Sequence, residues 1–394
     1  MAYVVSASST VTPNPAITSH IKQRPRQKRG LSLFSSKTRK RSRTKFPELG
    51  KKPVSPYYGF HSTKEREAGA IATAMKRSEM AMFKKTHTLF RPPGEADSLI
   101  IRVADGCPWN GCKFCGMYKG VKYNFQGLEK AEREISKHWK SWPDARRIFL
   151  ADGDVMHLDF QTLEKMLISL NEKFSRLARI GVYANGASIL AKSDAELRRL
   201  KELKLNTLYM GLESGDEQTL KEMNKQESAE NMIEAGQRAQ AAGLRMSVMV
   251  LIGLAGKERS LEHARETADV LNEMQPRLLS ALRLVTVPGT PLYDGRDGSP
   301  SRPSIDNEQD QRPARRSGPT FKMVTEFEAV TETREMISHL ELESTVFRAD
   351  HSSNIVPLEA RFPKDKERLL NQLDALLASG QLDETSPGPL PWSL

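Results

Sequence analysis

Cysteine is nearly absent from this chain. Only three cysteines occur in 394 residues, and they lie within nine positions, as Cys107, Cys112 and Cys115. A disulfide framework requires an even number of cysteines in a small secreted domain, so that class of protein is excluded. Three thiols in one short segment instead indicate ligands of a soft metal centre, either zinc or an iron–sulfur cluster.

Long apolar runs are missing as well. No stretch of about 18 apolar residues occurs in the sequence, so we expect neither a transmembrane helix nor a membrane partner. The first residues contain no secretory h-region and no cleavage pattern. Together with the lack of disulfides, these absences favour a reducing, cytoplasmic location.

Acidic residues are scarce in the first part of the chain. Residues 1–90 hold 19 Lys and Arg but 4 Asp and Glu, a balance of +15, whereas the whole chain carries +11. Residues 1–60 are expected to form a disordered basic tail, followed by a helical lead-in over 61–94. The tail is compatible with nucleic-acid binding, with a transit peptide, with a merely solvated tail, or with an extension upstream of a start at Met80 or Met82.

A regular alternation of strand and helix patterns begins near residue 98. Six apolar segments of strand length are separated by amphipathic segments of helix length. The predicted strands cover residues 98–103, 146–151, 178–184, 206–210, 244–251 and 278–285. Six successive βα units imply an α/β fold with a parallel sheet and right-handed crossovers, two units short of a (β/α)8 barrel.

The remaining boundaries follow from composition. The βα units define a core over residues 95–293, and residues 294–319 are a polar, Pro- and Gly-containing segment that we expect to be a disordered insertion. Helical patterns return within residues 320–380, which we expect to form a helical C-terminal extension. Residues 381–394 are expected to be coil.

The cysteine segment follows the first predicted strand, at the end where α/β folds place their chemistry. Structural zinc normally takes four protein ligands, and only one Cys-x-x-Cys pair is present, with no histidine nearby in sequence. A distant histidine completing a Cys3His zinc site stays an alternative. Three thiolates on an iron–sulfur cluster would leave one iron open to a small molecule.

Several motifs carry a resemblance to the radical S-adenosylmethionine (SAM) superfamily. The segment Cys107–Cys115, with the aromatic Phe114 before its last cysteine, is similar to that family's cluster motif, although its C-x4-C-x2-C spacing is one residue longer than usual. Gly211–Gly215 and Leu220–Lys225 resemble the branch shared by methylthiotransferases and the Elongator-type catalytic subunit. The resemblance covers residues 95–292 and, more loosely, 320–378, and implies a partial (βα)6 TIM-type barrel.

The resemblance also implies roles for individual residues. The three cysteines would bind a [4Fe–4S] cluster. A second set would bind SAM, namely Phe114, Asp152, Gly153, Asp154, Glu213, Ser214, Lys225 and Gly253. Polar groups that we consider as catalytic candidates are Asp154, Tyr118, Tyr183 and His351. The structural alternatives are an ordinary turn at 152–154, a surface lysine at 225, and a capping network around 347–354.

The reaction implied by the resemblance is reductive cleavage of SAM. A reductant such as flavodoxin or ferredoxin would supply the electron, and the resulting 5′-deoxyadenosyl radical would take hydrogen from an unknown substrate. No further cysteines exist for a second cluster, which argues against a methylthiotransferase and for a single-cluster enzyme. Two alternatives stay open: a zinc-binding, nucleic-acid-associated protein, and a cluster-binding scaffold without catalytic activity.

Overall fold

The computed structural model describes residues 89–293 and 321–389, which belong to one compact unit, Glu79–Leu394. The expected basic tail 1–60, the insertion 294–319 and the alternative starts at Met80 and Met82 lie outside the described residues. Of the lead-in expected over 61–94, only residues 89–94 are described. They run into a short 3-10 helix, η1 (Pro93–Glu95).

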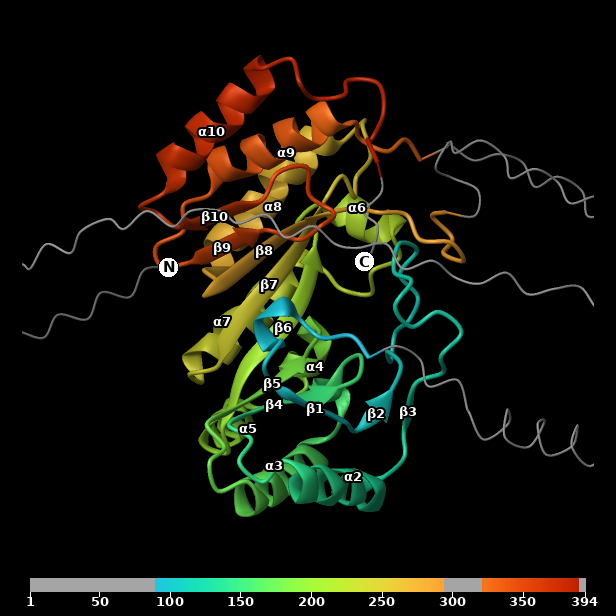
Figure 1. The fold of residues 1–394 in the computed structure, drawn as a ribbon, viewed down its shortest axis with the longest axis vertical. Helices are drawn as coiled ribbons and strands as arrows, with labels where there is room; N and C mark the ends of the chain where they lie inside the picture. Colours follow the sequence, from blue (N-terminus) through green and yellow to red (C-terminus); the bar gives the residue numbers. More distant parts are fainter. Residues whose placement is uncertain (1–88, 294–320, 390–394) are drawn as a thin grey trace, which may run out of the picture. The chain divides into compact units, whose positions relative to one another are not determined.

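Six parallel strands form the main part of an open sheet (Figure 1). Each pairs in parallel with the next along the chain, which confirms the predicted α/β fold. The strands are β1 (Leu99–Arg102), β4 (Arg147–Ala151), β5 (Arg179–Tyr183), β6 (Leu205–Glu213), β7 (Arg245–Ile252) and β8 (Leu278–Arg283). A separate antiparallel hairpin, β2 (Ala104–Asp105) and β3 (Asn124–Phe125), brackets the cysteine segment.

Helices connect the strands, and several begin at the caps that the sequence provides. A capping box forms at Ser193: its hydroxyl accepts from Glu196 N–H, and the Glu196 carboxylate accepts from Ser193 N–H. The described helices are α2 (Leu128–Ser141), η2 (Val155–His157), α3 (Phe160–Lys173), α4 (Gly186–Leu190), α5 (Asp194–Glu202), α6 (Glu217–Glu222), α7 (Ala229–Ala241), α8 (Ser260–Met274), α9 (Glu326–His339) and α10 (Lys366–Ala378).

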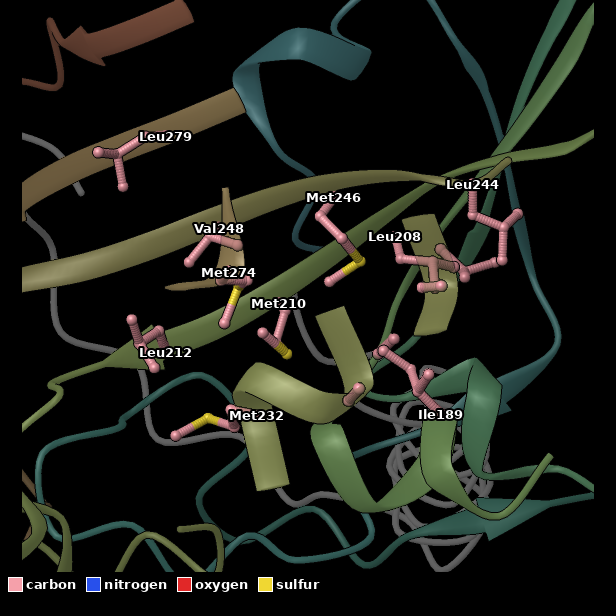
Figure 2. Packing of buried hydrophobic residues seen from close by; sticks show 14 of the residues in the cluster. Ile189, Leu208, Met210, Leu212, Met232, Leu244, Met246, Val248, Met274 and Leu279 are labelled. Atoms are coloured by element: carbon pink, nitrogen blue, oxygen red, sulfur yellow. The ribbon is translucent and has the colours of Figure 1, made fainter. Parts of the chain in front are cut away.

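The core lies between the sheet and its helices (Figure 2). Leu208, Met210 and Leu212 of β6 are fully buried and belong to the same apolar cluster as Met232 of α7 and Met274 of α8. Successive side chains of a strand point to opposite faces, so the intervening residues of β6 face away from these helices. The strand thereby presents one face to the core and the other to a cavity described below.

The C-terminal extension is not purely helical, which corrects the sequence-based expectation. Besides α9 and α10 it contains β9 (Val346–Ala349) and β10 (Leu358–Arg361). β9 pairs in parallel with β8, and β10 pairs antiparallel with β9, so both strands extend the sheet. Each strand is only four residues long. An alternation of buried and exposed side chains over four residues is too short to tell a strand from a loop in the sequence.

None of the helices within residues 89–293 and 321–389 combines the length and the apolar character required to cross a bilayer.

Candidate active site

The three cysteines line one cavity of about 380 Å³ at the carboxyl ends of β1, β4, β5 and β6. Each of them is half-buried. Most of the residues singled out from the sequence share this cavity: Phe114, Tyr118, Gly153, Asp154, Tyr183, Glu213 and Lys225. They come from four different strand ends, so the parallel sheet brings them together, as expected for this class of fold.

Glycine at position 153 allows the turn after β4 to lie directly against the cysteine segment. A Cβ atom at this position would lie 2.1 Å from Gly106 O and 2.7 Å from Cys107 Cα. Tyr118 also binds this turn. Its hydroxyl accepts from Gly153 N–H at 3.1 Å and donates to Asp152 Oδ1 at 3.1 Å. Tyr118 therefore fixes the turn on the cysteine segment.

Asp154 lines the cavity, and one of its carboxylate oxygens has no hydrogen-bond partner among the described residues. Its Oδ2 accepts from Ser188 Oγ at 2.5 Å and from Asn185 Nδ2 at 3.3 Å. Its Oδ1 is buried and has no hydrogen-bond partner among the described residues. Burial raises the pKa of Asp154 to about 6, although Ser188 opposes the shift. A buried acceptor without a partner is costly, so a cationic group of a ligand beside this carboxylate would lower that cost.

Glu213 and Lys225 form an ion pair in the wall of the cavity. Glu213 sits at a bulge where β6 shifts register against β7, and its φ of 65° lies in the left-handed region. Its carboxylate folds back over Gly211, where a Cβ would lie 2.0 Å from Oε1. Lys225 Nζ lies 3.7 Å from Glu213 Oε1 and donates to Gly211 O at 2.7 Å. Burial acts to lower the pKa of Lys225, but Glu213 and the other nearby negative groups together outweigh it and raise the pKa above its usual value.

Four of the residues predicted to contribute to the site do not line the cavity. Asp152 is fully buried beside it, with Arg102 Nε at 3.5 Å. Ser214 is also fully buried, and its hydroxyl accepts from Asp216 N–H at 2.9 Å. Gly253 faces the C-terminal extension, since its N–H donates to Glu332 Oε1 at 2.7 Å.

His351, the fourth of these residues, lies in the loop between β9 and β10. Its Nδ1 is 2.9 Å from Ser353 Oγ. The neighbouring backbone and side chains are tied to the sheet: Arg283 Nε donates to Ser353 O at 2.7 Å, and Asn354 Nδ2 donates to Ala281 O at 2.9 Å. This is the capping network that the sequence offered as the structural alternative for this segment.

The cavity also contains residues that the sequence reasoning missed. Asn185 and Ser188 follow the third predicted strand, and the rule that places function at strand ends could have identified them. Glu227, whose carboxylate accepts from Ala187 N–H at 3.1 Å, does not follow a predicted strand, so that rule could not have identified it. Trp109 and His157 likewise line the cavity through tertiary packing.

The donor set fits a cluster better than a single metal ion. Within the part of the chain that the structure describes, no three His, Cys, Asp or Glu side chains are arranged to hold one ion. In a cluster the thiolates bind different irons and need not converge on a point. Burial raises the pKa of the Cys112 thiol to about 11, which is unsuited to an activated nucleophile. A metal would hold the same thiol deprotonated.

One curated protein is similar in sequence to part of this chain. The heme chaperone HemW of Bacillus subtilis is 24% identical over 156 residues, which are 39% of this chain and 40% of that protein. The chain thus spans less than half of this curated relative.

Two solved structures give weaker similarities. Methylornithine synthase aligns with a TM-score of 0.41 and 14% identity, over 71% of this chain and 81% of that one. Coproporphyrinogen III oxidase of Escherichia coli aligns with a TM-score of 0.37 and 15% identity, over 48% of this chain and 44% of that one.

The family-model comparison provides the assignment. The Radical SAM superfamily model matches residues 101–271, the region that holds the three cysteines, the Gly153 turn and the Glu213–Lys225 pair. This superfamily uses a [4Fe–4S] cluster together with SAM. Over residues 101–271, less than half of its length, this chain is therefore similar to the radical SAM superfamily.

Proposed function

We propose that this protein is a single-cluster radical SAM enzyme, with Cys107, Cys112 and Cys115 as the cluster ligands. When bound, the reduced cluster supplies the electron that divides SAM into methionine and a 5′-deoxyadenosyl radical, which abstracts hydrogen from a substrate still to be identified. The observation that carries the proposal is the shared cavity, where the only three cysteines of the chain face both Asp154 and the Glu213–Lys225 pair.

The charges in the cavity support SAM as the ligand. SAM has an ammonium group, a carboxylate and a sulfonium, so it needs an acceptor at one end and a cation nearby. The Asp154 carboxylate would accept from the ammonium group, and Lys225 would bind the carboxylate of SAM. Glu213, at the bulge of β6, would accept from a ribose hydroxyl.

The remaining wall of the cavity would face the substrate. Tyr183 and Tyr209 pack edge to face with ring centroids 6.3 Å apart, and both line the cavity. Aromatic walls exclude water, which protects a reactive radical from side reactions. Asp154, Tyr118 and Tyr183 stay candidates for contact with reactants, whereas the network around His351 favours a structural role for that histidine.

Anaerobic reconstitution, reduction with dithionite and assay for 5′-deoxyadenosine test the proposal. We expect absorbance of an iron–sulfur cluster, cleavage of SAM, and loss of cleavage when any one cysteine is replaced by alanine. Bound zinc without cluster absorbance would instead favour the zinc-binding alternative. A cluster without SAM cleavage would favour the non-catalytic scaffold. A reductant such as flavodoxin would replace dithionite as the electron donor in a second assay.

A further inference from the structure

Three hydrogen bonds attach the cysteine segment to the chain that follows α6. Trp109 Nε1 donates to Asn224 O at 2.8 Å, and Asn224 Nδ2 donates back to Gly111 O at 2.9 Å. Next to them, Lys113 N–H donates to Met223 O at 2.9 Å. The partners are more than 100 residues apart in sequence, and Figure 1 shows the chain between β2 and β3 reaching α6.

The backbone at Asn224 is shaped for this double contact. Its φ of 54° lies in the left-handed region, which asparagine tolerates better than most residues. Its own N–H donates to Lys221 O at 3.1 Å and so ends α6. The carbonyl and the side-chain amide of Asn224 are then both available to the cysteine segment.

The loop between Cys107 and Cys112 also has internal contacts. Asn110 takes a left-handed φ of 46°, and its amide donates to Tyr118 O at 2.7 Å and to Val121 O at 3.1 Å. The Trp109 indole lies against Gly111, where a Cβ would be 2.7 Å from the ring. The longer loop is thus held internally by Asn110 and externally by Asn224.

Asn224 directly precedes Lys225, whose ammonium group reaches the same cavity as the cysteines. We propose that Asn224 is a positioning residue that holds the cysteine segment in register with Lys225. Where SAM is concerned, this inference rests on the proposed function. Because linkage is reciprocal, a ligand bound at Lys225 would also stabilise the cysteine segment. Displacement of that segment would in turn lower the affinity for the ligand.

Thiol labelling of the cluster-free protein tests the positioning role. All cysteines of the chain lie in this segment, so the labelling rate with a bulky maleimide reports on it alone. Asn224→Gly keeps the left-handed backbone and removes the amide, which contributes one hydrogen bond of about 1 kcal/mol. We expect labelling about fivefold faster than in the wild type, while the free energy of unfolding in urea falls by no more than about 1 kcal/mol.

Two further variants make this comparison decisive. Trp109→Phe removes the indole donor while it keeps an aromatic ring, and should accelerate labelling in the same direction even if Asn224→Gly does not fold. Lys204→Gly is the matched control, since Lys204 has a φ of 68° and lies in the turn between α5 and β6. Its labelling rate should equal that of the wild type. Wild-type rates in both Asn224→Gly and Trp109→Phe would overturn the positioning role.

Release of iron to a chelator from the reconstituted protein tests the coupling to Lys225. We expect SAM to slow this release in the wild type, and the protection to fall about fivefold in Asn224→Gly. Full protection in a variant with accelerated labelling would overturn the coupling. If the wild type assembles no cluster, the proposed function fails, while the labelling rates still decide the positioning role.

Discussion

A buried carboxyl group links the C-terminal extension to the turn after β7, and it gives the sharpest prediction about stability. Glu332 of α9 is fully buried. Its Oε1 accepts from Gly253 N–H at 2.7 Å, and its Oε2 accepts from Ser260 Oγ. Burial raises the pKa of Glu332 to about 8, although Ser260 and Gly253 oppose the shift.

The raised pKa makes stability depend on pH with a definite sign. The folded state keeps the proton of Glu332 up to about pH 8, whereas the unfolded chain loses it near the ordinary value of 4.5. The stabilisation is therefore complete below about pH 4.5 and is lost as the pH rises to about 8. One pKa unit corresponds to about 1.4 kcal/mol, so between about pH 6.5 and 8 the free energy of unfolding should fall by about 2 kcal/mol.

His263 on α8 is the other titratable group in contact, with Nδ1 3.3 Å from Glu332 Oε1. Burial lowers the pKa of His263 to about 4. Its contribution to the free energy of unfolding is therefore lost only as the pH falls from about 6.5 towards 4. Measurements above about pH 6.5 therefore isolate Glu332. The nearby Arg259–Asp216 ion pair, at 3.0 Å, keeps its charges throughout this range.

Urea unfolding followed by far-ultraviolet circular dichroism measures the effect in Glu332→Gln and the wild type at matched cluster content. We expect the variant to lack this pH dependence, so that its stability relative to the wild type rises by about 2 kcal/mol between about pH 6.5 and 8. Glu343→Gln, the same charge change on an exposed side chain, should follow the wild-type profile. A difference between Glu332→Gln and the wild type that does not vary with pH would refute the reasoning.

The active site gives three further predictions. Asp154→Asn should weaken SAM binding, measured by calorimetry, at least tenfold. The affinity of the wild type for SAM should decrease when the pH is lowered below about 6, because Asp154 then gains a proton. An affinity that does not vary with pH would contradict this role of Asp154. Lys225→Met should weaken SAM binding about tenfold or more, whereas the exposed Lys221→Met should not. Gly153→Ala should lower the free energy of unfolding by about 1–3 kcal/mol and impair cluster incorporation, whereas Gly94→Ala, with its closest contact at 3.4 Å, should be tolerated.

The sequence by itself determined the strand-and-helix order and predicted where metal chemistry would lie. The six parallel strands are confirmed because each is a short apolar run bounded by turns, a local property of the chain. Three clustered cysteines predict the proposed metal centre for a similar reason, since residues close in sequence stay close in space. The Ser193 capping box is another local feature that the sequence predicts.

Only the tertiary structure decided which polar residues face the cavity. Tyr118, Asp154 and Lys225 line it, whereas the Gly253 N–H and the His351 ring make contacts elsewhere, because their orientation depends on packing of the C-terminal extension. The strands β9 and β10 were missed because four residues carry too little periodicity. Hydrogen bonds between residues more than 100 positions apart, as between Trp109 and Asn224, leave no local signal in the sequence.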